Sequence, residues 1–374
     1  MNKRDRVIKT LELQQADVSP IYQPPFERTG AAYQIFQESR EAEDLWELNP
    51  VGDITELRFW NADCAVMDPF VLRKDPGYPS PPEHPDLKLK RNGSLMKTVT
   101  RENGLRYTWY VGPYFRTKQI IYEYWDEYGR PSDWFNQEED FNRRKWKEYR
   151  DALEGYVYPI AGLANTMWEA VFEGMGLDRV AYYIRKDPTF IHEVVGEYAR
   201  LNLESIKGLS DAGVEVVFMA DDLGQKNRTL ISNRHFREFL LPEYRKMFQA
   251  AKKRGMFFVL HSCGNITDFL GDLVDAGLSA IQALEPASGI DLAYLKKEYG
   301  DKVAFMGGMD SSVVLNFGTP KDVVHEVKRC LKAAGSSGGY FAGTSHNILD
   351  CPWENILTFR KALEKYRTYP LNFD

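Results

Sequence analysis

The chain has 374 residues, of which 43% are hydrophobic and 27% charged, and its formal net charge is −6. This is long for one domain and short for three, although single α/β barrels often exceed about 250 residues. The apolar share is enough for a large core. A negative chain without basic blocks is not expected to bind nucleic acid or an anionic membrane surface. No stretch approaches the ~18 uninterrupted apolar residues of a transmembrane helix.

Cysteine use and the first residues bear on the cellular compartment. The cysteines are too scattered to suggest a dense disulfide framework. They are Cys64, Cys263, Cys330 and Cys351. The opening "MNKRDRVIKTLELQQ" is charged and lacks the apolar core of a signal peptide. We therefore expect a reduced, cytoplasmic protein.

The first 150 residues have no regular rhythm. They include a proline-rich patch at 75–86 and an alternating segment at 93–112 around a Glu102–Gly104 turn, which predicts a hairpin. We expect residues 1–150 to form an N-terminal extension or cap that contains early barrel elements. Residues 151–374 would form the main part of the barrel. We expect the two parts together to form one structural unit.

From residue 155 onward, apolar runs alternate with segments of helical period. The predicted strands are 155–163, 214–222, 256–264, 278–286, 302–310 and 338–346. The predicted helices are 167–176, 198–213, 242–255, 267–277, 292–300, 320–335 and 352–366. Glycine closes nearly every helix, as C-caps favour. This alternation predicts a parallel sheet with right-handed crossovers.

Five successive predicted strands end in polar or metal-capable side chains. These are Asp221 and Asp222, then His261 and Cys263, then Glu285, Asp310, and finally Ser345 with His346. In a doubly wound sheet ligands gather at one switch point, whereas in a (β/α)8 TIM barrel every strand end converges on one mouth. The pattern therefore favours the TIM barrel.

His261 and Cys263 are candidate metal ligands. They lie two residues apart at the end of a strand, so both side chains point to the same face. Imidazole nitrogen and thiolate sulfur suit zinc. A carboxylate at Glu285, one strand end and roughly 5 Å away, could reach the same ion. A buried histidine beside a core cysteine, and a capping or ion-paired Glu285, are the alternatives.

The remaining strand ends offer candidate substrate contacts. Asp222 could accept a proton, bind a substrate hydroxyl or cap the following turn, while Asp221 should point the other way. Asp310 is equally ambiguous, and Gly307 and Gly308 beside it permit close approach of backbone or ligand. We expect Asp222 and His346 to be catalytic. The expected substrate-binding residues are Asn165, Asp310 and Ser345.

Several segments resemble a known family. "HSCGNI", "IQALEPASGIDLAYLKKEYG", "VAFMGGMD" and "SHNILDCPWENI" are similar to the uroporphyrinogen decarboxylase superfamily, and specifically to its corrinoid-dependent methyltransferase branch. The resemblance covers roughly residues 150–370, with an echo near the start. It implies a (β/α)8 barrel whose zinc is held by a His-x-Cys pair, a glutamate one strand later and a cysteine at the last strand.

His261, Cys263 and Glu285 match the first three of these ligands. At the fourth position the chain reads "GTSH", with Ser345 and His346 but no cysteine. His346 could complete the zinc site, the position could be left to water or substrate, or Cys351 could fold back.

The resemblance implies methyl transfer between a small substrate and the cobalt of a corrinoid. No "DxHxxG" cobalamin motif is present, so the corrinoid would belong to a separate partner protein. Abundant aromatic residues, with 21 Phe, 21 Tyr and 8 Trp, favour an O-methyl aromatic substrate.

Three other functions are open. The first is transfer from a methylcorrinoid to a thiol or tetrahydrofolate. The second is decarboxylation, for which the family needs N-terminal arginines where this chain has only Arg28. The third is a non-enzymatic binding barrel with a structural metal. The oligomeric state is also open, a homodimer included.

Overall fold

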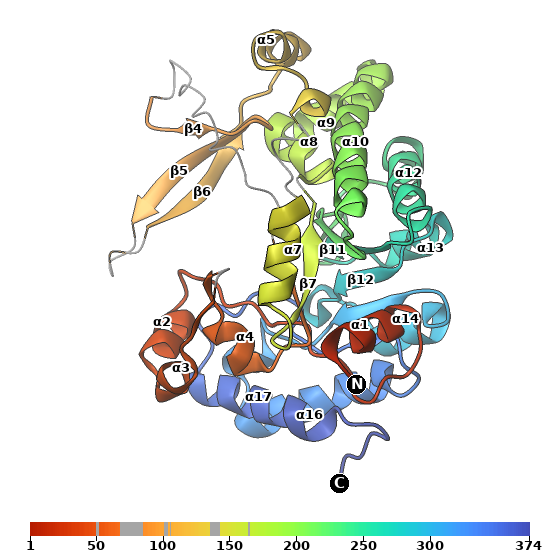
Figure 1. The fold of residues 1–374 in the computed structure, drawn as a ribbon. Coiled ribbons are helices and arrows are strands. Elements are labelled where there is room, and N and C mark those ends of the chain that lie inside the picture. Colours follow the sequence, from red (N-terminus) through yellow and green to blue (C-terminus); the bar gives the residue numbers. More distant parts are fainter. Residues whose placement is uncertain (50–51, 68–84, 101–103, 105, 135–142, 164) are drawn as a thin grey trace.

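The computed structural model describes residues 1–49, 52–67, 85–100, 104, 106–134, 143–163 and 165–374 (Figure 1). The strands are β1 (Leu48–Asn49), β2 (Gly52–Asp53), β3 (Cys64–Met67), β4 (Lys88–Leu89), β5 (Ser94–Thr100), β6 (Arg106–Pro113), β7 (Tyr158–Gly162), β8 (Val216–Ala220), β9 (Gly224–Gln225), β10 (Arg228–Thr229), β11 (Phe257–Ser262), β12 (Ala280–Ala283), β13 (Ala304–Gly307) and β14 (Tyr340–Phe341). The helices are α1 (Lys3–Leu11), α2 (Ala31–Glu38), α3 (Arg40–Leu45), α4 (Thr55–Trp60), α5 (Lys118–Tyr128), α7 (Arg143–Ala152), α8 (Trp168–Met175), α9 (Leu177–Lys186), α10 (Pro188–Asp211), α11 (Asn233–His235), α12 (Leu241–Lys252), α13 (Thr267–Ala276), α14 (Leu292–Tyr299), α15 (Val314–Phe317), α16 (Pro320–Cys330) and α17 (Trp353–Tyr366).

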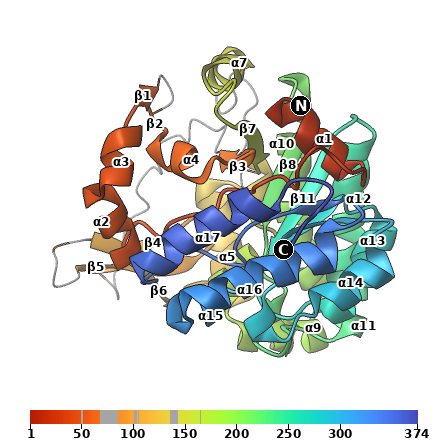
Figure 2. The same cartoon turned by 90° about the horizontal axis from the view of Figure 1, so that it is seen from below.

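The centre of the molecule is a seven-stranded parallel sheet. Its order is β14-β13-β12-β11-β8-β7-β3, so strands that follow one another in the chain lie side by side. Helices connect the strands and cover the outside of the curled sheet, with α16 and α17 side by side on one flank (Figures 1 and 2). The fold is therefore α/β and TIM-barrel-like, as the alternating pattern predicts.

A short segment at residues 20–23 links the two edges of this sheet. Tyr22 N–H donates to the carbonyl of Ala342, just beyond β14, at 3.0 Å. Gln23 N–H donates to the carbonyl of Cys64, in β3, at 2.9 Å. Both neighbours run parallel to the segment, which thus occupies the gap between the first and last strands of the sheet.

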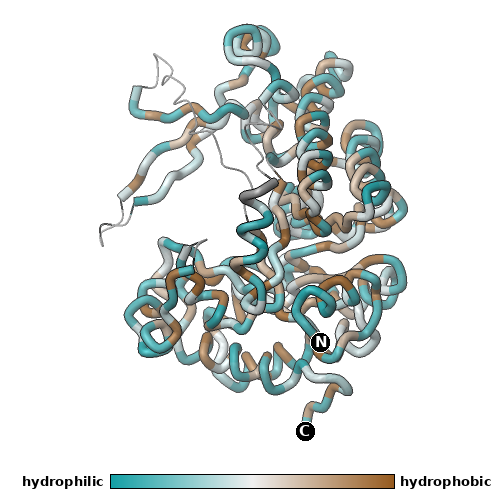
Figure 3. The backbone as a smooth tube through the Cα atoms, in the orientation of Figure 1, coloured by the Kyte–Doolittle hydropathy of each residue, from teal (hydrophilic) through white to brown (hydrophobic). Residues whose placement is uncertain are grey.

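Apolar side chains fill the space on both faces of the strands. One buried cluster lies inside the curl and contains inward-facing residues from the strands, such as Ile160, Val259 and Met306, together with Val7 and Leu11 of α1. A larger cluster fills the space between the strands and the outer helices. Because both faces are buried, these strands are almost continuously hydrophobic. The longer helices expose a polar side, visible as alternating brown and teal along α10 (Figure 3).

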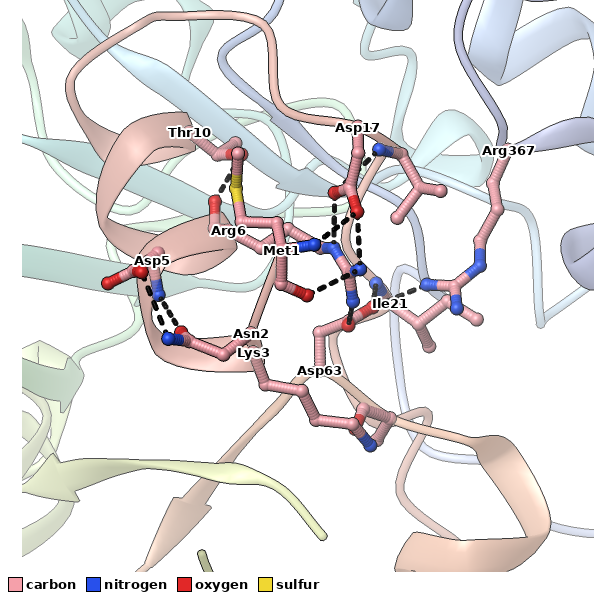
Figure 4. Close-up of polar contacts among 12 residues, drawn as sticks. Met1, Asn2, Lys3, Asp5, Arg6, Thr10, Asp17, Ile21, Asp63 and Arg367 are labelled. Atoms are coloured by element: carbon pink, nitrogen blue, oxygen red, sulfur yellow. Dashed lines mark hydrogen bonds and ion pairs between the residues drawn. The ribbon is translucent and has the colours of Figure 1, made fainter. Parts of the chain in front are cut away.

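A charged cluster lies at the amino end of the strands (Figure 4). Asp63, which directly precedes β3, is fully buried and pairs with the guanidinium groups of Arg6 and Arg367. Asp63 also accepts a hydrogen bond from the backbone N–H of Ile21 at 2.7 Å. Arg6 in turn holds Asp17 at 2.7 Å, and this lowers the pKa of the Asp17 carboxyl. The cluster ties both ends of the chain to the sheet.

The predicted helices and strands from residue 155 onward are all present, although the strands are shorter than expected and one helix is longer. The helix expected at 198–213 begins at Pro188, because Asp187 accepts from Phe190 N–H and caps the helix while Pro188 occupies its first position. The strand expected at 338–346 is reduced to Tyr340–Phe341, since Gly338 and Gly339 both have positive φ.

The hairpin predicted in the N-terminal part is confirmed. β5 and β6 form the antiparallel hairpin, which projects from the molecule in Figure 1. The turn residues 101–103 and most of the proline-rich patch lie outside the described residues. All four cysteines are free thiols. In the described part of the chain, no helix has the length and apolar character needed to span a membrane. The division near residue 150 stays a prediction.

Candidate active site

The ends of β8 and β11 bring three predicted residues together. The strands pair in parallel with Ala220 opposite His261. Because side chains alternate along a strand, residues two positions further on lie on the same face, which makes Asp222 level with Cys263. Cys263 N–H donates to Asp222 Oδ1 at 2.8 Å and joins the two strand ends.

These three side chains have the chemistry and spacing of a zinc site. The ligand atoms of Asp222, His261 and Cys263 all lie within 4.8 Å of one another. His261 Nε2 is 3.4 Å from Cys263 Sγ and 3.7 Å from Asp222 Oδ1. Around a tetrahedral zinc with bonds of about 2.0–2.3 Å, adjacent ligand atoms are roughly 3.3–3.7 Å apart. The three groups therefore fit the metal that the sequence suggested.

Burial keeps the histidine and the cysteine uncharged in the absence of a metal. It lowers the pKa of His261, so the imidazole is neutral. It also raises the pKa of Cys263, and the negative charge of Asp222 adds to that rise. Both neutral forms can bind a metal, since the imidazole offers a lone pair and a bound cation converts a thiol to a thiolate.

A glutamine that the sequence analysis did not select holds the ring of His261. Gln282 lies opposite His261 in the β11–β12 ladder and is 4% exposed. Its Oε1 makes a short contact with His261 Nδ1. The alternation that places His261 on the inner face also places Gln282 there. The pairing register of the two strands would therefore have identified Gln282 as a neighbour of His261.

Glu285, predicted as the third zinc ligand, lies beside the group of three but outside it. Its Oε2 accepts from Ser288 Oγ at 2.8 Å and from Gly264 N–H at 3.4 Å. The two residues before it, Ala283 and Leu284, have φ values of 96° and 59°. These left-handed conformations interrupt the alternation at the end of β12 and redirect the following side chain. Its role as a ligand stays a prediction.

The last two strand ends use their polar side chains mainly within the protein. Asp310 Oδ1 accepts from the backbone N–H groups of Ser312 and Val313 at 3.0 and 2.8 Å, so it caps that turn. Ser345 is fully buried, with its hydroxyl 3.4 Å from that of Ser311. None of these contacts turns Asp310 or Ser345 toward the Asp222–His261–Cys263 group.

His346, Cys351 and Asn165 have different surroundings. His346 is exposed, and its charge would oppose protonation of His261 and so contributes to the lowered pKa of His261. Cys351 is 2% exposed, with Sγ 3.9 Å from the carbonyl oxygen of Ser311, so it does not fold back to the metal group. Asn165 is half-buried in the segment between β7 and α8.

Two further carboxyls complete this end of the sheet. Asp221 is fully buried and points away from the mouth, as predicted, where it accepts from Trp168 N–H, Glu169 N–H and the Tyr244 hydroxyl. Burial raises the pKa of Asp221 to about 6. The carboxyl of Glu169 was missed, and burial next to Asp222 and Asp221 raises its pKa to about 8. It sits in the first turn of α8, inside a segment that reads only as an amphipathic helix.

Gly307 and Gly308 permit the close backbone approach that was expected of them. Their φ values are 94° and 86°. A Cβ on Gly307 would lie 2.7 Å from the carbonyl oxygen of Thr344 and 3.1 Å from that of Ala283. Only glycine fits at this position between neighbouring strand ends.

Comparison with known proteins identifies the family. The model of the uroporphyrinogen decarboxylase (URO-D) family matches residues 116–366. The chain belongs to the uroporphyrinogen decarboxylase family. The match includes β8, β11 and β12, and therefore the whole Asp222–His261–Cys263 group.

Individual relatives of this family divide between two activities. A methylated-thiol–coenzyme M methyltransferase of Methanosarcina mazei is 22% identical over 218 residues, which span 58% of this chain and 56% of the relative. A uroporphyrinogen decarboxylase of Pseudoalteromonas atlantica is 25% identical over 384 residues, 97% of each chain. The chain thus spans little more than half the length of the methyltransferase that it matches.

A solved structure supports the fold. A methyltransferase from Methanosarcina mazei superposes with a TM-score of 0.65 at 16% identity, covering 98% of this chain and 99% of the other. At this identity the likeness shows the shared fold alone.

Proposed function

We propose that this protein is a zinc-dependent methyltransferase that moves a methyl group between a small substrate and the cobalt of a separate corrinoid protein. The Asp222–His261–Cys263 group carries the proposal. A family that includes both methyltransferases and decarboxylases supports an enzyme of one of these two kinds. We also infer a complete (β/α)8 barrel with residues 20–23 as its first strand.

The three side chains would hold the metal through Asp222 Oδ1, His261 Nε2 and Cys263 Sγ. Zinc, when bound, supplies Lewis-acid polarisation and lowers the pKa of a coordinated thiol or water. Three protein ligands leave a fourth position for substrate, which is typical of catalytic zinc and not of a closed structural site. In this proposal Asp222 changes from a catalytic residue to a ligand, and Glu285 is the candidate for the fourth position only when no substrate occupies it.

An O-methyl aromatic compound is the substrate that we favour. In that reaction the O–CH3 bond breaks, and the methyl group bonds to cobalt(I) with the electron pair of cobalt. The departing phenolate then takes up a proton. His346, exposed at the same end of the sheet, would supply that proton, and Asn165 and Asp310 would lie on the substrate side. The reverse direction, from a methylcorrinoid to a thiol or tetrahydrofolate, is the main alternative, and the name of the Methanosarcina mazei relative supports a thiol.

Exposed apolar side chains support a protein partner at this end of the sheet. Trp109 and Val111, on the hairpin that follows β3, are 62% and 50% exposed. Val313 and Phe317, in the connection that follows β13, are 52% and 81% exposed. We infer that these side chains would contact a docking partner such as a corrinoid protein.

Decarboxylation is the second candidate, because the Pseudoalteromonas atlantica decarboxylase aligns with almost the whole chain. Arg28 argues against it. Its guanidinium ion-pairs with Glu56 at 2.9 Å and lies 4.4 Å from the centre of the Tyr33 ring, so it is not free to hold substrate carboxylates.

The test supplies zinc-loaded protein with a methoxybenzene and free cob(I)alamin. We expect the absorption spectrum of cob(I)alamin to change to that of methylcobalamin, at a rate that falls at least 100-fold in Cys263→Ala. Uroporphyrinogen and methylcobalamin with a thiol are tested in parallel. Decarboxylation of uroporphyrinogen, unaffected by Cys263→Ala, would contradict the methyltransferase proposal.

A further inference from the structure

The ring of His261 has two nitrogens, and only one of them faces the other metal-binding atoms. Nε2 lies 3.4 Å from Cys263 Sγ and 3.7 Å from Asp222 Oδ1. Nδ1 points the opposite way, to Gln282. A neutral imidazole carries its proton on one nitrogen and a lone pair on the other. Whether His261 can bind a metal with Nε2 therefore depends on which nitrogen is protonated.

We propose that Gln282 is a positioning residue that keeps the proton of His261 on Nδ1 and so leaves the lone pair of Nε2 free for the metal. The inference rests on the proposed zinc site, and it adds the device that orients one of its ligands. Gln282 Oε1 can only accept a hydrogen bond, so its contact with Nδ1 requires an Nδ1–H donor.

The surroundings of Gln282 hold the amide in this position. Gln282 lies directly opposite His261 in the β11–β12 ladder and is 4% exposed. The ring of His261 packs in addition near Phe218, with centroids 6.1 Å apart. The strand register therefore fixes both the donor and the acceptor, and water does not need to supply the second hydrogen bond of the ring.

The thiol of Cys263 is consistent with the same tautomer. The 3.4 Å contact between Sγ and Nε2 is a hydrogen bond from the thiol only if Nε2 carries a lone pair. With the proton on Nε2, this contact would no longer be a hydrogen bond from the thiol, and the ring would be unable to bind a metal from this side.

A neutral amide also suits the charge of the site. Histidine ligands of metals commonly donate to a carboxylate or a backbone carbonyl. Here Asp222 accepts from Cys263 N–H and Glu285 accepts from Gly264 N–H, so two carboxyl groups already lie at this end of the sheet. Glutamine fixes the ring without adding a further negative charge.

The test compares wild type with Gln282→Leu and Gln282→Glu in metal-free protein. Leucine removes the acceptor and keeps a similar volume, whereas glutamate restores an acceptor that cannot donate. The ring nitrogens of His261 are followed by long-range 1H–15N correlation spectra, with His261→Gln used to assign the signals. We expect an Nδ1–H tautomer in wild type and in Gln282→Glu, and a mixture dominated by Nε2–H in Gln282→Leu.

Zinc affinity, measured by competition with a chromophoric chelator, provides the second readout. We expect Gln282→Leu to bind zinc 10- to 100-fold more weakly, the range found when such partners are removed, and Gln282→Glu to bind at least as tightly as wild type. Circular dichroism confirms that each variant is folded. An Nε2–H tautomer in wild type, or an unchanged Nδ1–H tautomer in Gln282→Leu, would overturn the inference. Because these spectra need no metal, they separate its failure from that of the zinc proposal, which wild-type zinc binding tests.

Discussion

The two ends of the parallel sheet use charged side chains in opposite ways. At the amino end, the buried carboxylate of Asp63 is paired with Arg6 and Arg367 and accepts a backbone hydrogen bond as well. At the carboxyl end, Asp222 and Glu169 lie among other carboxyls, and the pKa of Glu169 is raised to about 8. Carboxylates are thus paired with arginines where the ends of the chain meet, whereas carboxyl groups lie next to one another where a cation would bind.

This difference shows how to separate structural from functional charge in a barrel-like fold. A buried carboxylate with full pairing contributes to stability, and removal of it leaves its partners unpaired. Ionised carboxyls that lie close together repel one another and so lower the stability of the metal-free protein. A bound ligand or a proton relieves this repulsion. Four sets of substitutions test the two behaviours.

The largest expected effect on stability is at the amino end. Asp63→Ala should lower the free energy of unfolding by about 3–5 kcal/mol, because it leaves the buried Arg367 without its carboxylate and Arg6 with Asp17 alone. Chemical denaturation followed by circular dichroism measures this. Asp44→Ala is the control, since the Asp44 side chain is 65% exposed in its pair with Arg40, and should change stability by less than about 0.5 kcal/mol. A loss below about 1 kcal/mol for Asp63→Ala would show that the cluster is not structural.

Tyr244→Phe tests a buried carboxyl at the other end that accepts three hydrogen bonds. The hydroxyl of Tyr244 donates to Asp221, and both residues are fully buried. Removal of the hydroxyl should cost about 1–3 kcal/mol, because Asp221 loses one of its three donors. The same denaturation experiment applies. Unchanged stability would mean that Asp221 does not need this donor.

Glu169→Gln tests the crowded carboxyls through pH. The pKa of Glu169 is raised, so between about pH 5 and 8 the folded state binds more protons than the unfolded state. Stability of metal-free wild type should therefore fall as pH rises through this window, by up to about 1.4 kcal/mol per pH unit for one proton. The variant should lack this part of the slope. Equal slopes in the two proteins would contradict the raised pKa of Glu169.

The smallest expected differences concern which residues complete the metal site. Asp222→Asn should weaken zinc binding at least about tenfold, since Asp222 belongs to the group within 4.8 Å. Glu285→Gln should have a smaller effect because Ser288 holds its carboxylate. His346→Ala should bind zinc like wild type. Chelator competition measures all three, and a larger loss in Glu285→Gln than in Asp222→Asn would reverse the assignment.

The sequence predicted the arrangement of the strands and the His261–Cys263 pair because both follow from local patterns. Helix–strand alternation sets the parallel order, and spacing by two residues sets the common face. Asp222 was selected for its place at a strand end, although its part in the metal group needed the β8–β11 register. Glu285 was harder to place, because Ala283 and Leu284 take positive φ values that no sequence pattern at those residues signals.

Other residues depend on contacts across long stretches of the chain. Gln282 reaches His261 only through strand pairing, and Glu169 meets Asp222 only once α8 packs at the end of the sheet. Asp310 has the right position but serves the turn that follows it. Local sequence therefore identifies the end of the sheet that carries the site, while tertiary packing decides which of its polar side chains are available.

The zinc content of the purified protein is the most direct test of whether the carboxyl end of the sheet holds a metal. Purified wild type and Cys263→Ala are incubated with zinc, freed of unbound metal by gel filtration and analysed by mass spectrometry for zinc per chain. We expect about one zinc per chain in wild type and a large loss in a folded Cys263→Ala, because one of three ligands is removed. Equal zinc in both proteins, or none in a folded wild type, would contradict this expectation.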